Sequence, residues 1–145
     1  MKNHGLFFNV HDYISKRYGG VHRMASFMRE HDWDCEVLDW AYYFTIEELK
    51  QFAQSRITNN TKFVGFGFPF EIWSDTINEF ISWIKKTWPK ICIIWGSQIY
   101  PGFASVGYKD VDYYVVGYGE YALLSIMKVE FGNENRSSLK LDANW

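Results

Sequence analysis

The sequence predicts a single α/β domain in which helices cover both faces of a parallel β-sheet. Short apolar runs alternate with amphipathic stretches along the chain, which is the pattern of strand–helix–strand units. The 145 residues fit one domain, and 48% hydrophobic residues with 20% aromatics supply one sizeable core. We therefore expect one domain over residues 1–131, followed by a tail, linker or edge strand over residues 132–145.

The predicted strands are apolar runs bounded by polar residues or glycine, each too short for three helical turns. The run Ile91–Trp95 is apolar throughout, as expected for a central parallel strand that is covered on both faces. In chain order the predicted strands are Gly5–Val10, Cys35–Asp39, Phe63–Gly67, Ile91–Trp95 and Asp112–Val116.

Between these strands, apolar residues recur at spacings of three and four, which predicts helices over residues 21–30, 45–55, 73–88 and 123–131. Thr45 and Glu48 have the spacing of a capping box, and Pro89 ends the third helical pattern. Right-handed crossovers then favour a three-layer fold, flavodoxin-like or Rossmann-like, with five strands in the order 2-1-3-4-5.

Charge and hydropathy argue against two classes of partner. The net charge is −2, with 15 basic and 17 acidic residues well mixed, so we expect no nucleic-acid partner. No stretch approaches the roughly 20 apolar residues of a membrane span, and residues 1–10 do not have the pattern of a leader peptide. We expect a cytoplasmic protein with no membrane partner.

Cys35 and Cys92 lie in strand-like runs, where an unpaired cysteine is usually a small buried hydrophobe. Two distant cysteines cannot supply the closely spaced thiolates of an iron–sulfur site, so we expect no such cluster in this chain. Catalytic constellations cannot be told from background, and His4, His22 and His31 have no partner pattern. Whether the chain is an enzyme stays open, but we do not expect it to be catalytic alone.

Ligands of parallel α/β sheets bind outside the carboxyl ends of the strands, which locates a candidate site. Glycines there permit close approach of a ligand, although they equally serve tight strand-to-helix turns. Glu120 is expected at the start of the last helix, so the positive end of the helix dipole explains it as well as a ligand contact does. The candidate binding residues are Asn9, His11, Gly65, Gly67, Phe68, Gly96, Ser97, Gly117, Gly119 and Glu120.

Three of these segments carry a family resemblance. They are Val64-Gly65-Phe66-Gly67-Phe68, Gly96-Ser97, and the stretch from Asp112 through Gly117-Tyr118-Gly119-Glu120. Over residues 5–131 the chain resembles the cobalamin-binding domain found N-terminal in radical S-adenosylmethionine enzymes. The resemblance implies a cobalamin (vitamin B12)-binding module that is accessory to a radical S-adenosylmethionine catalytic domain. Seven tryptophans and ten tyrosines can hardly all be buried in one small domain, so we also expect an exposed aromatic surface that supports association with such a domain or with a second copy of the chain.

The wider cobalamin-binding family carries Asp-x-His-x-x-Gly after strand one, and its histidine binds cobalt from below. This chain reads Asn9-Val10-His11-Asp12-Tyr13-Ile14, so His11 matches, while Asn9 and Ile14 replace the aspartate and the glycine. The resemblance therefore implies His11 as the lower cobalt ligand, within a motif that is only partly kept.

Two alternatives remain. Ser97 in place of a glycine, Tyr118 in place of an acidic residue, and bulky aromatics favour a degenerate module that has lost the cofactor and binds a protein or a substrate. An unrelated flavodoxin-like nucleotide binder is the other. Against it, residues 11–20 contain neither Gly-x-Gly-x-x-Gly nor Gly-x-x-x-x-Gly-Lys.

Overall fold

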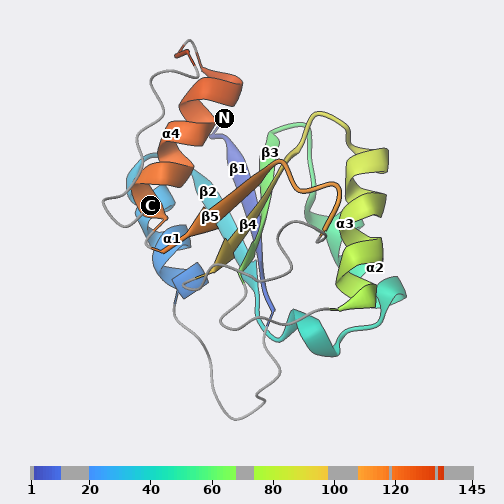
Figure 1. The fold of residues 1–145 in the computed structure, drawn as a ribbon. Helices are drawn as coiled ribbons and strands as arrows, with labels where there is room; N and C mark the ends of the chain where they lie inside the picture. Colours follow the sequence, from blue (N-terminus) through green and yellow to red (C-terminus); the bar gives the residue numbers. More distant parts are fainter. Residues whose placement is uncertain are drawn as a thin grey trace.

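The computed structural model describes residues 2–10, 20–67, 74–97, 108–117, 119–132 and 134–135. Within them a parallel sheet of five strands has the order β2-β1-β3-β4-β5 (Figure 1). The strands are β1 His4–Asn9, β2 Asp34–Leu38, β3 Thr61–Gly67, β4 Cys92–Ser97 and β5 Tyr113–Val116. The predicted flavodoxin-like α/β fold and its strand order are confirmed.

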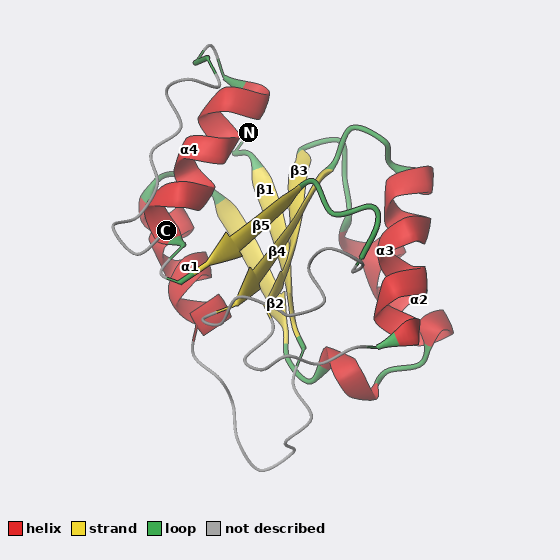
Figure 2. Cartoon of the chain, in the orientation of Figure 1, coloured by secondary structure: helices red, strands yellow, loops and turns green. Residues whose placement is uncertain are grey.

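The helices form a layer on each face of the sheet. Helices α1 and α4 cover one face, and α2 and α3 cover the other (Figure 2). Their bounds are α1 Gly20–Glu30, α2 Ile46–Arg56, α3 Asp75–Thr87 and α4 Glu120–Phe131, and a 3-10 turn η1, Ala41–Tyr43, follows β2.

Alternation along the strands separates two cores. Phe8 of β1 faces α2 and α3, where its ring stacks on Phe66 at 5.2 Å and meets Phe80 edge-on at 5.1 Å. Phe7 faces α1 and α4 and meets Phe63 edge-on at 5.1 Å. Both faces of the sheet are thus apolar, as expected for a covered parallel sheet.

Local signals set most of the element ends. The capping box is present: Glu48 N donates to Thr45 Oγ1 at 3.1 Å, and Thr45 N donates to Glu48 Oε1 at 2.9 Å. Strand β4 runs two residues beyond its predicted end, because Gly96 and Ser97 continue the ladder with β5. Helix α4 begins at Glu120, the acidic residue expected at its start, three residues before the apolar stripe that opens at Leu123.

Some predictions fall outside the described residues. They include the predicted site residues His11 and Phe68, position Tyr118, and the edge strand or linker of the tail, so these stay predictions. No helix in the described part of the chain is long and apolar enough to cross a membrane.

Candidate functional site

The carboxyl ends of β1, β3, β4 and β5 bring five of the predicted residues into one row. Asn9 is the register partner of Gly67, and Gly67 is the partner of Gly96. Ser97 follows Gly96 in β4, and its carbonyl accepts a hydrogen bond from Gly117 N at 2.8 Å. We call this row, Asn9, Gly67, Gly96, Ser97 and Gly117, the carboxyl edge.

Three of the predicted glycines are closed off by the chain's own side chains. A Cβ atom would lie 2.8 Å from a ring carbon at Gly65, 2.1 Å from a methyl carbon at Gly67 and 2.9 Å from a methyl carbon at Gly119. The side chains that fill these places are Phe7 at Gly65, Val21 at Gly67 and Val115 at Gly119. Packing against the chain's own side chains therefore accounts for these three glycines.

Gly96 and Gly117 differ from those three. Among the described residues, a Cβ on Gly96 would meet nothing nearer than the Val115 carbonyl oxygen at 3.8 Å. Alternation with Ile94 turns this bare backbone toward the layer of α1 and α4. Gly117 has φ 89°, a left-handed conformation that a side chain would strain. At the end of β4 the described residues thus leave room beside the main chain, and the turn after β5 requires a glycine.

A polar network lies at the β1 and β2 end of the same edge. Asn9 is buried, with 1% of its surface exposed, and its side-chain Nδ2 donates a hydrogen bond to Asp39 Oδ1 at 3.0 Å. His22 Nε2 lies 2.9 Å from Asp39 Oδ1 and 3.0 Å from Oδ2. Because a carboxylate only accepts, Nε2 carries a proton and donates it to Asp39, and in that tautomer of an uncharged imidazole Nδ1 would keep its lone pair.

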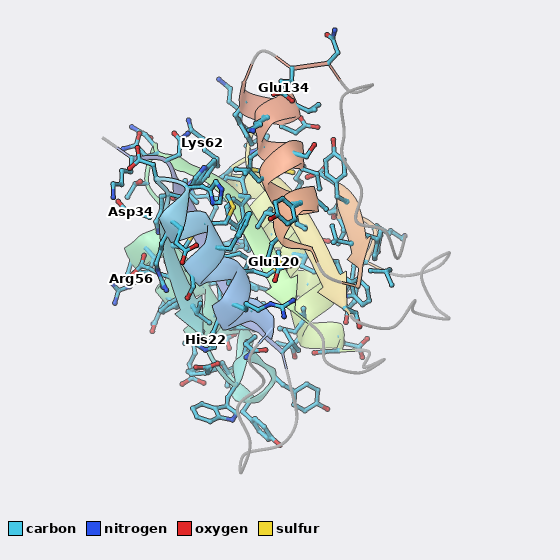
Figure 3. All side chains as sticks on the ribbon, turned by 90° about the vertical axis from the view of Figure 1, so that its left-hand side faces the viewer. His22, Asp34, Arg56, Lys62, Glu120 and Glu134 are labelled. Carbon is cyan, nitrogen blue, oxygen red and sulfur yellow. The ribbon has the colours of Figure 1, made fainter. Side chains whose placement is uncertain are left out.

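Sequence reasoning missed this network, since His22 had no partner in the local pattern. Figure 3 shows His22 at the end of the molecule away from Asp34 and Lys62, which lie near the amino ends of β2 and β3. Asp39 follows β2 directly, and His22 lies in the first turn of α1. The available signal was topological, because a residue that follows one parallel strand and a residue at the start of the helix after the neighbouring strand lie at the same edge of the sheet.

Glu120 pairs with a cation of the chain. It is the first residue of α4, its side chain is 13% exposed, and it forms an ion pair with Nε of Arg23 in α1. A carboxylate in a first helical turn is also favoured by the helix dipole. Both features account for Glu120 without a ligand, so its predicted contact to a cofactor stays a prediction.

Aromatic residues border the edge at its β2 end. Tyr42 and Tyr43 of η1 are 39% and 48% exposed, and their rings meet edge-on at 5.5 Å. Trp40, just before them, has φ 56°, an uncommon conformation for a bulky side chain. We call Trp40, Tyr42 and Tyr43 the aromatic rim.

Two buried groups have raised pKa values that support structural roles. Burial raises the pKa of the Cys35 thiol to about 12, and Cys92 is buried as well, as the sequence predicted. Burial also raises the pKa of Tyr108 to about 12, and its hydroxyl accepts a hydrogen bond from Ser74 N at 3.2 Å. In the described part of the chain, no group of three or more His, Cys, Asp or Glu side chains is placed to hold a metal ion.

No protein-family model and no curated protein matches this sequence. Solved structures do match. The radical S-adenosylmethionine methyltransferase TsrM from Kitasatospora setae, solved with tryptophan substrate and an S-adenosylmethionine analogue, gives a TM-score of 0.73 at 16% identity over 95% of this chain. A cobalamin-binding protein from Desulfitobacterium hafniense gives 0.66 at 10% identity over 90% of this chain.

This chain shares its fold with these proteins. It spans 28% of the TsrM chain and 60% of the cobalamin-binding protein. The response regulator TrrA from Thermotoga maritima, solved with Mg²⁺–BeF, also matches, with a TM-score of 0.53 at 18% identity over 84% of this chain and 92% of its own. At such identities the likeness establishes a flavodoxin-like architecture, and function depends on the site.

Proposed function

We propose that this chain is a cobalamin-binding module that serves a radical S-adenosylmethionine enzyme. One observation carries the proposal: Gly96, at the end of β4, has bare backbone toward the α1 and α4 layer, with Ser97 and Gly117 beside it. The likeness to a cobalamin-binding protein and to a radical S-adenosylmethionine methyltransferase supports the choice of ligand over other ligands of this fold.

The residues at the carboxyl edge fit such a ligand only in part. A large cofactor that approaches the main chain needs positions without side chains, which Gly96 and Gly117 supply. Gly65, Gly67 and Gly119 do not supply them, because the chain's own side chains fill their places. We therefore assign the cofactor contacts to the β4 and β5 end of the edge, and cobalamin bound there would supply its own cobalt chemistry.

Two histidines are candidates for the lower cobalt ligand. The family motif assigns this role to His11, which lies outside the described residues. His22 has the support that metal-bound imidazoles usually have, since Asp39 holds its other ring nitrogen. Changes of His11→Ala and His22→Ala, made separately, should distinguish them, because loss of a cobalt ligand alters the visible spectrum of the complex.

The test of the proposal is retention of hydroxocobalamin after desalting, read from the visible spectrum. We expect wild type and Gly96→Ala to retain the cofactor, because one methyl group fits in ordinary contact at this position. Gly96→Leu should lose at least tenfold in affinity while its far-UV circular dichroism and melting temperature stay near those of wild type. Wild type without retained cobalamin, or Gly96→Leu with unchanged affinity, would refute the assignment.

The partner is the second part of the proposal. Since the chain spans 28% of TsrM, the catalytic domain would lie in another chain or in another part of a longer protein. We place the domain boundary near residue 131, where α4 ends, and the protein in the cytoplasm.

A degenerate interaction module is the competing candidate, and a specific observation favours it. The polar side chains of this region bind each other: at the β1 and β2 end Asp39 is held by Asn9 and His22, and between α1 and α4 Arg23 pairs with Glu120. Such an edge needs no ligand to satisfy these groups. Absence of cobalamin binding, with association that depends on protein concentration, would support this candidate.

A further inference from the structure

Asp39 contacts both ends of the connection between β1 and α1. Asn9 is the last residue of β1, and His22 is the third residue of α1. Both donate to the same carboxylate, Asn9 Nδ2 at 3.0 Å and His22 Nε2 at 2.9 Å from Oδ1. One side chain, contributed by the end of β2, therefore joins the two stems of a connection to which it does not belong.

The two hydrogen bonds to Asp39 lie in a largely buried position, where they can stabilise the local structure. The Asp39 side chain is 12% exposed, and Asn9 is 1% exposed, so water competes little for the shared oxygen. A carboxylate has enough lone-pair positions to accept from both donors at once. Other contacts hold the end of β1 and the start of α1 against β3 independently of Asp39, because Val10 N donates to Gly67 O at 2.8 Å and Val21 packs against Gly67.

We propose that Asp39 is a positioning residue that holds the end of β1 and the start of α1 in a fixed relation. Asn9 belongs to the carboxyl edge and His22 is a candidate cobalt ligand of the proposed function, so the same contacts would set how the edge meets its ligand. That second part rests on the proposed function, whereas the positioning role does not. Asp39 acts through Asn9 and His22 and need not contact a ligand itself.

Trypsin tests the positioning role directly, because Lys16 and Arg17 are the lysine and the arginine between Asn9 and His22 and trypsin cleaves after these residue types. Under native conditions, Asp39→Ala should raise the rate of cleavage after Lys16 and Arg17 at least fivefold relative to cleavage at other sites. The ratio between sites matters, since a purely structural role would raise cleavage throughout the chain. Mass spectrometry of the first fragments gives this ratio.

Glu36→Ala is the matched control. Glu36 lies in β2, three residues before Asp39, and its carboxylate binds His4 at 2.8 Å and Arg56 at 3.3 Å. The variant removes a comparable set of contacts from β2, so it should leave the cleavage ratio within twofold of wild type. His22→Ala releases one stem and should give a smaller increase than Asp39→Ala, and His22→Gln, which keeps an N–H donor, should restore the ratio.

The outcomes separate this inference from the proposed function. An Asp39→Ala ratio equal to that of Glu36→Ala overturns the positioning role; if Asp39→Ala does not fold, an unchanged ratio in His22→Ala overturns it. Hydroxocobalamin affinity at least tenfold weaker in Asp39→Ala, but unchanged in Glu36→Ala, supports the link to the ligand. Equal affinities overturn that link, whereas wild type that binds no cobalamin refutes the proposed function and leaves the cleavage result standing.

Discussion

Gly67 and Gly96 are register partners at the carboxyl edge, yet alanine should destabilise the protein at Gly67 and have little effect at Gly96. A Cβ on Gly67 would lie 2.1 Å from Val21 Cγ2 and 3.6 Å from its Cβ. Valine in a helix has one strongly preferred rotamer, so Val21 cannot rotate away without strain. Overpacking of this kind costs about 1–3 kcal/mol. At Gly96, where the nearest described atom is 3.8 Å away, alanine should change the free energy of unfolding by less than about 1 kcal/mol.

Urea unfolding followed by tryptophan fluorescence measures both variants. Gly67→Ala should lower the transition midpoint clearly, whereas Gly96→Ala should leave it near that of wild type. The double variant Gly67→Ala/Val21→Ala should recover part of the loss, because the clashing methyl groups are removed. Equal free energies of unfolding for the two alanine variants, or no recovery in the double variant, would refute the reasoning and, with it, the contrast between the closed and bare ends of the carboxyl edge.

Three further predictions concern buried groups. With a pKa of about 12, the Cys35 thiol has almost no thiolate at pH 8. Iodoacetamide should therefore modify Cys35 only after unfolding, which peptide mass spectrometry would show. Modification of the folded protein at the rate of a free thiol would contradict this. Burial raises the pKa of Tyr108 from the ordinary value near 10 to about 12. The stability that depends on the neutral hydroxyl is therefore present below pH 10 and is lost as the pH rises from 10 to 12, which lowers the free energy of unfolding by at most roughly 2.7 kcal/mol. Tyr108→Phe should therefore flatten the alkaline decline in urea midpoint, and an unchanged decline would exclude Tyr108 as a cause. His4 joins β1 to Glu36 of β2 and to Thr61 of β3 through hydrogen bonds of 2.8 and 2.7 Å. His4→Ala should therefore lower the free energy of unfolding by about 1–3 kcal/mol, whereas His31→Ala on the surface should lower it by less than about 0.5 kcal/mol. Equal losses in the two variants would argue against this bridge.

The elements and their order could be predicted because each depends on signals that are local in sequence. The apolar run Ile91–Trp95 identifies a covered strand without reference to any other segment, and Thr45 with Glu48 identifies a helix start. Strand order then follows from the handedness of the crossovers and from where the glycine loops fall. The ends were less predictable, since β4 extends through Gly96 and Ser97 only because β5 lies beside them.

The candidate site depends on contacts between elements, which a single sequence does not reveal. Gly67 and Gly96 look alike as residues that end strands, and they differ because Val21 of α1 fills one place and nothing in the described chain fills the other. The pair of His22 and Asp39 is similarly invisible locally, because 17 residues separate its members. Their common edge follows from topology, but their contact depends on how α1 packs on the sheet.

The strand order also separates the aromatic rim from the bare end of the carboxyl edge. Tyr42 and Tyr43 follow β2, the first strand of the order β2-β1-β3-β4-β5, whereas Gly96 belongs to β4. Three steps between neighbouring strands correspond to about 14 Å. A ligand over Gly96 and a protein partner on the exposed tyrosines would then occupy different parts of the edge. The combined change Tyr42→Ser/Tyr43→Ser should leave hydroxocobalamin retention unchanged, while it weakens any association that sedimentation velocity detects at high concentration. Loss of cobalamin in that variant would place the ligand on the rim instead, and association as strong as that of wild type would remove the rim as the interface.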